Sequence, residues 1–312
     1  MSRKTSFKEQ MFRVLNSLNC YGQSKYKAKQ ESYKQGNKGK VKGIYSKKTM
    51  ADYKKVAEQF QSWSKTKGYN FKNLADVSDN HILQYLKERQ DTGKSSWTIS
   101  KDLSALNKIF TREITKKDTG LKSRKNADIK NNRGLGNNYR LSVYKKNKEL
   151  IDFISAVGIR RQSVVSVSPL NAIRDKQGTI IGFSIIEKGG KPRNCYVIQG
   201  KQKEITFFVN KHQSKNGNKP FWSKVDKNFN THWYRAEYAK TLYNELISAK
   251  TNKQDYFNGY KDLFVNSSKL GKAIEGHRET TKGYNTEVLA IVSQNLGHNR
   301  IDVVYANYLS RF

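Results

Sequence analysis

Between residues 44 and 115, apolar residues recur at the spacing of amphipathic helices. Three helices are predicted, starting at Ser46, at Asp76 or Ser78, and at Ser96 or Thr98, because these side chains are good N-caps. Their apolar faces consist of Tyr53, Val56, Ala57, Phe60 and Trp63; of Ile82, Leu83, Tyr85 and Leu86; and of Ile99, Leu103, Leu106 and Ile109. Such faces without strand signals predict a small helical bundle with these residues in its core.

Beyond residue 140 the helical pattern is interrupted by β signals. Ile180–Ile186 and Asn194–Ile198 flank a Lys-Gly-Gly-Lys turn, which predicts a hairpin, and Ile205–Val209 suggests a further strand. Helical patterns return around Trp233–Ser248, Glu287–Asn295 and the C-terminus. The predicted fold class is therefore mostly α with a small antiparallel β-sheet, a helical domain preceding a mixed α+β domain.

Composition shifts suggest four segments. Residues 1–43 are rich in Lys, Gln, Ser and Gly, and we expect a basic N-terminal arm or solvated tail with a short helix over Met11–Leu18. The helical domain spans 44–115, and a basic linker without periodicity spans 116–139. The mixed domain spans 140–312.

Charge narrows the choice of partner. The chain has 60 Lys and Arg against 26 Asp and Glu, a formal net charge of +34, so a polyanion such as DNA or RNA is the expected ligand. No apolar stretch of about 20 residues is present, which argues against a membrane partner. Met1–Lys8 lack the apolar region of a signal peptide, and Cys20 and Cys195 match no metal or redox spacing, so we expect a cytoplasmic, nucleoid-associated protein.

Four segments carry candidate chemistry for breaking a phosphodiester, which requires a nucleophile, cationic donors and a proton donor. Arg160 lies in an apolar stretch, where a guanidinium needs an anion, and Lys188 lies at the hairpin turn. His232 and Arg235 are three residues apart, hence on one helical face. Leu296-Gly297-His298 is followed ten residues later by Tyr308.

This ordered set resembles the tyrosine recombinase family, also called phage integrases, over roughly residues 140–312. The family's catalytic domain typically reads Gly-Leu-Arg, a hairpin Lys, His-x-x-Arg, Leu-Gly-His and then Tyr. GIRRQS, KGGKPR, HWYRAEYA and VSQNLGHNR look like the branch carried by bacterial mobile elements. The segment 44–115 is similar to the family's core-binding, SAM-like DNA-binding domain.

The resemblance implies a role for each residue. Arg160 and Arg235 would bind the scissile phosphate, His232 and His298 would hold it and assist proton movement, and Lys188 would protonate the leaving 5′ oxygen. Tyr308 would attack and form a 3′-phosphotyrosyl link. The resemblance implies no cofactor and no metal.

Some positions depart from the family pattern or leave alternatives. Ser163 stands where many members have Glu or Asp, Ala236 stands where a second His is common, and an insertion is predicted near 253–282. Within it, Gly276-His277-Arg278 is an alternative to the His232–Arg235 motif. Neighbouring residues are alternative candidates for three of the roles: Tyr305 for Tyr308, Arg161 for Arg160, and Lys201 or Lys203 for Lys188.

The predicted function is that of a site-specific recombinase acting on double-stranded DNA, integrating or excising a mobile element. The resemblance implies a homotetramer assembled on paired sites, and an accessory DNA-bending or excision factor fits the same scheme. The alternatives are a catalytically decayed integrase that only binds DNA, a basic RNA-binding protein, and a type IB topoisomerase with the same chemistry.

Overall fold

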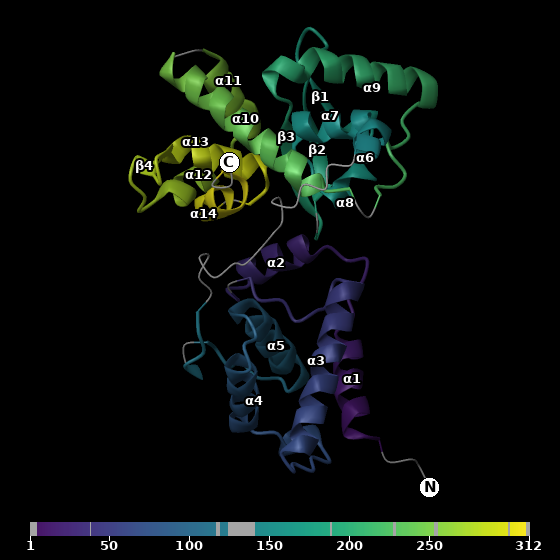
Figure 1. Ribbon diagram of the computed structural model, residues 1–312, viewed down its shortest axis with the longest axis vertical. Helices are drawn as coiled ribbons and strands as arrows, with labels where there is room; N and C mark the ends of the chain where they lie inside the picture. The colour runs from purple at the N-terminus through teal and green to yellow at the C-terminus, as the bar shows by residue number, and fades with distance from the viewer. Residues whose placement is uncertain are drawn as a thin grey trace. The chain divides into compact units, whose positions relative to one another are not determined.

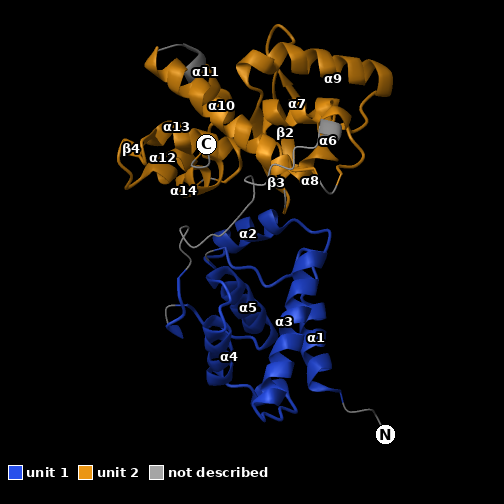
Figure 2. Ribbon diagram, in the orientation of Figure 1, with its two compact units in different colours: residues 1–129 blue, residues 130–312 orange. Residues whose placement is uncertain are grey.

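The chain divides into two compact units, residues 1–129 and 130–312 (Figure 2). The computed structural model describes residues 5–37, 39–116, 119–123, 141–187, 189–226, 229–252, 255–298 and 300–309. Each unit has its own hydrophobic core, and Figure 1 labels the elements. The predicted fold class, mostly helical with a small antiparallel sheet, is confirmed.

The described part of the N-terminal unit is helical. Its elements are α1 (Phe7–Ser17), α2 (Lys25–Lys34), α3 (Lys47–Thr66), the 3-10 turn η1 (Leu74–Asp76), α4 (Asp79–Asp91) and α5 (Ser96–Ile109). α3 and α4 both pack against α5 (Figure 1), and the ring of Phe60 lies at the centre of the core against Trp63, Tyr85 and Phe110. The three predicted amphipathic helices are therefore present.

The helix starts follow from local hydrogen bonds. The Ser46 hydroxyl accepts from the Thr49 amide, so α3 begins where its cap predicts. Of the two predicted starts for α4, Ser78 is the cap, whereas the Asp76 carboxylate accepts from the amides of the preceding turn. α5 begins at Ser96, the first of its two predicted starts, and Ser95 just before it is the cap.

Residues 7–17 form a core helix, so the short helix predicted over Met11–Leu18 is present but begins earlier and belongs to the core of the unit and not to a basic arm. Phe7, Met11 and Leu15 are buried at i, i+4 and i+8 and pack in the same core as α3 and α5. Ser6 and Glu9 cap this helix reciprocally, a signal visible in the sequence as Ser-x-x-Glu. The lysine-rich run that follows forms α2.

The predicted linker, 116–139, lies outside the described residues except for residue 116 and residues 119–123. Leu121 in that stretch is buried and belongs to the core of the N-terminal unit.

The C-terminal unit combines helices with a three-stranded antiparallel sheet in the order β1-β2-β3. Its first elements are α6 (Leu141–Lys146), α7 (Lys148–Val157), α8 (Arg161–Val164), η4 (Pro169–Asn171), β1 (Ala172–Arg174), β2 (Ile180–Glu187), β3 (Lys191–Tyr196) and η5 (Gln199–Lys201). They are followed by α9 (Gln202–Asn216), α10 (Thr231–Thr251), α11 (Asp255–Phe264), α12 (Ser267–Ile274), β4 (Thr280–Thr281), β5 (Tyr284–Asn285), α13 (Thr286–Asn295), α14 (Ile301–Val304) and the π-helical turn η6 (Tyr305–Leu309).

The sheet confirms one strand prediction and corrects another. β2 and β3 form the predicted hairpin, and Glu187 and Lys191 are its last pair before the turn. The strand predicted at Ile205–Val209 is wrong, because these residues lie in α9. Ile205 and Val209 are buried four residues apart, whereas Phe207 is 70% exposed, which is a helical and not an alternating pattern.

Candidate active site: a tyrosine, two histidines and a cluster of arginines

The site in the C-terminal unit depends on the sharp end of helix α7. Gly158 ends this helix in the left-handed region with φ of 65°, and Arg160 follows as the residue before α8. A methyl group at Gly158 would overlap the buried ring of Tyr238 on α10, so the close contact of α7 and α10 requires glycine there. The Gly158 carbonyl oxygen accepts a hydrogen bond from Arg235.

Helix α10 supplies Arg235 and, one turn earlier, His232. Arg235 is buried and donates to the carbonyl oxygens of Gly158 and Leu296. Its Nε donates to the Tyr308 hydroxyl over 3.2 Å. The His232 ring stacks on the Tyr308 ring, with 5.3 Å between centroids and 23° between planes. The predicted pair therefore does lie on one face of a helix.

Tyr308 lies in η6, and its hydroxyl faces two of the predicted side chains. Besides Arg235, the Nε2 atom of His298 lies 3.0 Å from this hydroxyl. Burial, together with the charges of Arg235 and Arg160, lowers the pKa of His298 to about 3. The imidazole is therefore neutral near pH 7, and in the tautomer that leaves Nε2 unprotonated it can accept a hydrogen bond from the Tyr308 hydroxyl.

Tyr305 has different surroundings. Its ring packs edge-on against Tyr284, with 5.8 Å between centroids. Within the described ranges, the tyrosine hydroxyl that contacts Arg235 and His298 is that of Tyr308.

The two neighbouring arginines also have separate partners. Arg160 donates to the Leu296 carbonyl oxygen over 2.9 Å and pairs with the Glu187 carboxylate. Arg161 points elsewhere and donates to the carbonyl oxygens of Val225, Asp226 and Phe229. Arg160 thus joins the cluster of Arg235 and Tyr308, whereas Arg161 fixes the segment that leads into α10.

Glu187 and Arg193 belong to the same cluster, and the sequence reasoning did not identify either. Glu187 ends β2, and its buried carboxylate pairs with both Arg160 and Arg193. Burial opposes ionisation of Glu187, but the two guanidinium charges outweigh it, so the pKa of this carboxyl is lowered. The signal available in the sequence was their place in the hairpin segment EKGGKPR, where both flank the turn.

The hairpin lysine predicted to act in the site, Lys188, lies outside the described residues. Lys191, also missed, is half-buried, and its Nζ donates to the Gly297 carbonyl oxygen over 3.3 Å. Burial, followed by the charges of Lys269, Arg160 and Arg193, lowers the pKa of Lys191. Lys201, one of the alternatives, pairs with Glu204 at the exposed start of α9.

The alternative motif, Gly276-His277-Arg278, is exposed. His277 and Arg278 lie in the turn before β4, and the Arg278 carbonyl oxygen accepts from Thr286. No group of three or more His, Cys, Asp and Glu able to hold a metal ion occurs in the parts of the chain that the structure describes. In those same parts, every helix is too short or too polar to cross a membrane.

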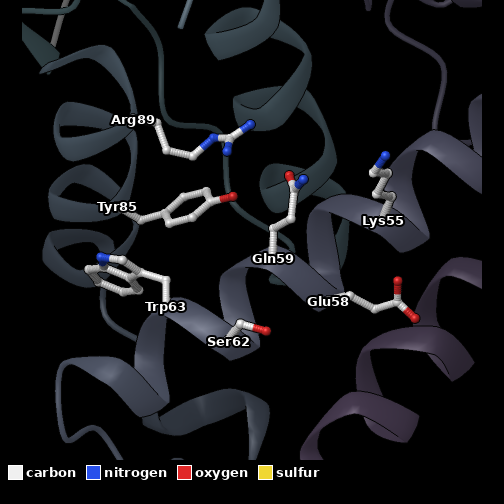
Figure 3. Close-up of a pocket in the computed structure, with 7 residues that line it drawn as sticks. All are labelled: Lys55, Glu58, Gln59, Ser62, Trp63, Tyr85 and Arg89. Atoms are coloured by element: carbon white, nitrogen blue, oxygen red, sulfur yellow. The ribbon is translucent and has the colours of Figure 1, made fainter. Parts of the chain in front are cut away.

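The N-terminal unit has a separate cavity of about 400 Å³ beside α3 and α4 (Figure 3). Its lining consists of Lys55, Glu58, Gln59, Ser62, Trp63, Tyr85 and Arg89. Arg89 is held by an ion pair with buried Asp102, and Trp63 donates to Glu88. The Tyr85 hydroxyl is buried without a hydrogen-bond partner among the described residues.

Residues 40–117 match the family model described as phage integrase, N-terminal SAM-like domain, a range that encloses the predicted helical segment 44–115. This match bears out the predicted resemblance to the phage integrase, or tyrosine recombinase, family for the residues that it covers. The sequence matches no curated protein.

Two solved structures are similar to the chain. One is XerH site-specific recombinase bound to difH substrate in a pre-cleavage complex, with 15% identity and a TM-score of 0.49; the match covers 98% of this chain and 94% of that one. The other is XerH bound to palindromic difH substrate in a post-cleavage complex, with 14% identity and a TM-score of 0.44, covering 88% of this chain and 98% of that one.

Proposed function

We propose that the protein is a site-specific recombinase that cleaves and rejoins double-stranded DNA, with Tyr308 as its nucleophile. The observation that carries the proposal is the environment of the Tyr308 hydroxyl. A neutral His298 nitrogen lies 3.0 Å from it and the Arg235 Nε lies 3.2 Å from it. A phenol, with an ordinary pKa of about 10, needs such a proton acceptor or a nearby cation to react at neutral pH.

In this mechanism the Tyr308 oxygen attacks the scissile phosphorus while His298 takes the phenolic proton. A new O–P bond forms and the P–O5′ bond breaks, and Lys188 gives the leaving 5′ oxygen its proton. Arg160 and Arg235 stabilise the charge on the non-bridging oxygens, because planar guanidinium groups suit phosphate, and His232 holds the same group. Attack by a second 5′ hydroxyl reverses the step and rejoins the strands. The phosphotyrosyl link preserves the bond energy, so the scheme needs no cofactor.

The remaining parts of the proposal concern partners. The net charge of +34 suits duplex DNA, and the family match over residues 40–117 supports a DNA-binding unit. Strand exchange requires two duplexes with two cuts each, so we propose a homotetramer on paired sites. Integration or excision of a mobile element is the proposed role, with an accessory DNA-bending or excision factor.

A suicide-substrate assay tests the proposal. Nicked duplexes drawn from the DNA on either side of the chain's own gene are incubated with the wild type, Tyr308→Phe and Tyr305→Phe, and denaturing gels detect covalent adducts. We expect adducts with the wild type and Tyr305→Phe and none with Tyr308→Phe. Adducts that persist in Tyr308→Phe and vanish in Tyr305→Phe would reassign the nucleophile. Tight binding without any adduct would indicate the alternative function, a catalytically decayed integrase that only binds DNA.

A further inference from the structure

One carboxylate lies among the arginines of the site. Glu187 is buried, and its two oxygens take different partners: Oε2 pairs with Arg160 and Oε1 pairs with Arg193. Arg235, which is buried, adds a third guanidinium group to the same cluster. Ser163, which follows Arg160 by three residues, carries no charge, so the carboxylate that pairs with Arg160 comes from the sheet.

Arg193 fixes Glu187 in turn. The Arg193 side chain is 4% exposed, and besides Glu187 it donates to the Asn295 carbonyl oxygen at the end of α13. Asn295 itself accepts from the Tyr196 amide and the Tyr238 hydroxyl, so β3, α10 and α13 meet at this point. The Glu187 carboxylate is therefore held from behind by a buried, rigid set of contacts.

Gly297 makes room for this arrangement. A Cβ atom added there would lie 2.9 Å from the Arg193 Cδ and 3.2 Å from the Arg160 guanidinium, and the backbone φ is +73°. The two arginine side chains therefore pack directly on the main chain of the Leu-Gly-His turn.

Arg160 differs from Arg193 in being partly open to a ligand, because its side chain is 29% exposed. A partly exposed arginine has many rotamers, and binding a phosphate requires one of them. Its partners inside the protein, the Glu187 carboxylate and the Leu296 carbonyl oxygen, approach from two elements and select that rotamer. Glu187 also offsets repulsion between Arg160 and Arg193, leaving the cluster of three arginines net positive for a phosphate.

We infer that Glu187 and Arg193 form a positioning pair: Arg193 fixes the Glu187 carboxylate, which orients Arg160 toward the scissile phosphate. This inference rests on the proposed function. Neither residue touches the reacting atoms in this scheme. Loss of the carboxylate leaves Arg160 next to the like charge of Arg193, so the Arg160 guanidinium turns toward solvent. The phosphate then loses one of its two arginine donors.

The test uses Glu187→Gln in the full-length protein, with Glu204→Gln as a matched control. Glu204 is an exposed glutamate paired with Lys201, so its change removes the same charge without touching the site. Single-turnover adduct formation is measured at saturating nicked duplex, and DNA affinity is measured separately. We expect the adduct rate to fall roughly 10- to 100-fold in Glu187→Gln, less than the loss of a donor itself, with affinity within about 2-fold. The control should match the wild type in both.

A double-mutant cycle with Arg160→Ala separates positioning from a structural role. If Glu187 acts through Arg160, Glu187→Gln lowers the rate by no more than about 2-fold when Arg160 is already absent. The same factor in both backgrounds would overturn the inference, as would an unchanged rate in Glu187→Gln alone. Absence of adduct in the wild type would instead overturn the proposed function.

A further variant guards against misfolding. Glu187→Gln combined with Arg193→Met removes both buried charges, so thermal unfolding should return toward the wild-type midpoint if the single variant is unstable. The inference expects the adduct rate of this stable double variant to remain low. A rate restored together with stability would show that the pair only supports the fold.

Discussion

The contact between Gly158 and Tyr238 gives a prediction whose size follows from the structure. Gly158→Ala places a methyl group at φ of 65°, where an L-residue costs about 1–2 kcal/mol. The methyl also overlaps the Tyr238 ring, which cannot retreat because it is fully buried and its hydroxyl bonds to Tyr196 and Asn295. Overpacking of this kind adds about 1–3 kcal/mol. The expected total loss in unfolding free energy is about 2–5 kcal/mol.

Gly178→Ala is the matched control. Gly178 has φ of 83° in an exposed turn with nothing within 4 Å of the added methyl, so it should lose only the backbone part. Any stabilisation by a stiffer unfolded chain is the same in both variants and cancels. For a unit of this size, the transition of Gly158→Ala should lie roughly 2–12 °C below that of the control.

Differential scanning calorimetry of the wild type and both variants measures these midpoints. Because the Gly158 carbonyl oxygen also accepts from Arg235, the adduct rate should fall in Gly158→Ala and stay near wild type in Gly178→Ala. Equal melting points in the two variants would refute the reasoning, since the clash with Tyr238 would then have no effect.

Four other outcomes are expected. The folded pKa of His298, about 3, lies below the unfolded value of 6.5, so its contribution to stability is present above pH 6.5 and is lost as pH falls toward 3. Calorimetry at several pH values should therefore show that His298→Gln lacks up to about 1.4 kcal/mol of this loss in unfolding free energy per pH unit. Arg161→Met should lose about 2 kcal/mol in denaturant unfolding, because three carbonyl oxygens lose their donor, while Arg160→Ala should mainly slow adduct formation. Tyr85→Phe should keep or gain about 1 kcal/mol, since its buried hydroxyl has no partner among the described residues, and a lower melting point would contradict this. DNA affinity should fall by about 10³ or more between 50 and 200 mM salt if six or more phosphates are contacted, and a shallow slope in titrations would argue against duplex binding.

Local patterns account for the parts of the fold that the sequence predicted. Ser46 and Ser78 cap their helices because a cap needs only a side-chain hydroxyl that accepts a hydrogen bond from the amide three residues later. The spacing of His232 and Arg235 places them on one face of α10 for the same local reason. The short helix predicted over Met11–Leu18 begins earlier, at Phe7, and this first turn was missed because the lysine-rich composition around it outweighed its capping box.

Contacts between distant elements account for what was not predicted. Val209 and Phe207 lie in a short apolar run that suits a strand or a helix, and only packing against the sheet decides. The role of Glu187 depends on Arg160, 27 residues earlier, and on Arg193 across the hairpin. No sequence spacing shows that these three meet.

The carbonyl oxygen of Leu296 accepts from both Arg160 and Arg235. A single main-chain atom is therefore a shared contact of the two guanidinium groups that would hold the phosphate, while Glu187 and the Gly158 carbonyl oxygen supply their separate contacts. Because that atom is present in every amino acid, substitution of the 296 side chain does not remove the shared contact. This contact between the two arginines can therefore persist while the side chain at 296 diverges, and DNA specificity can be varied on other surfaces without rebuilding it.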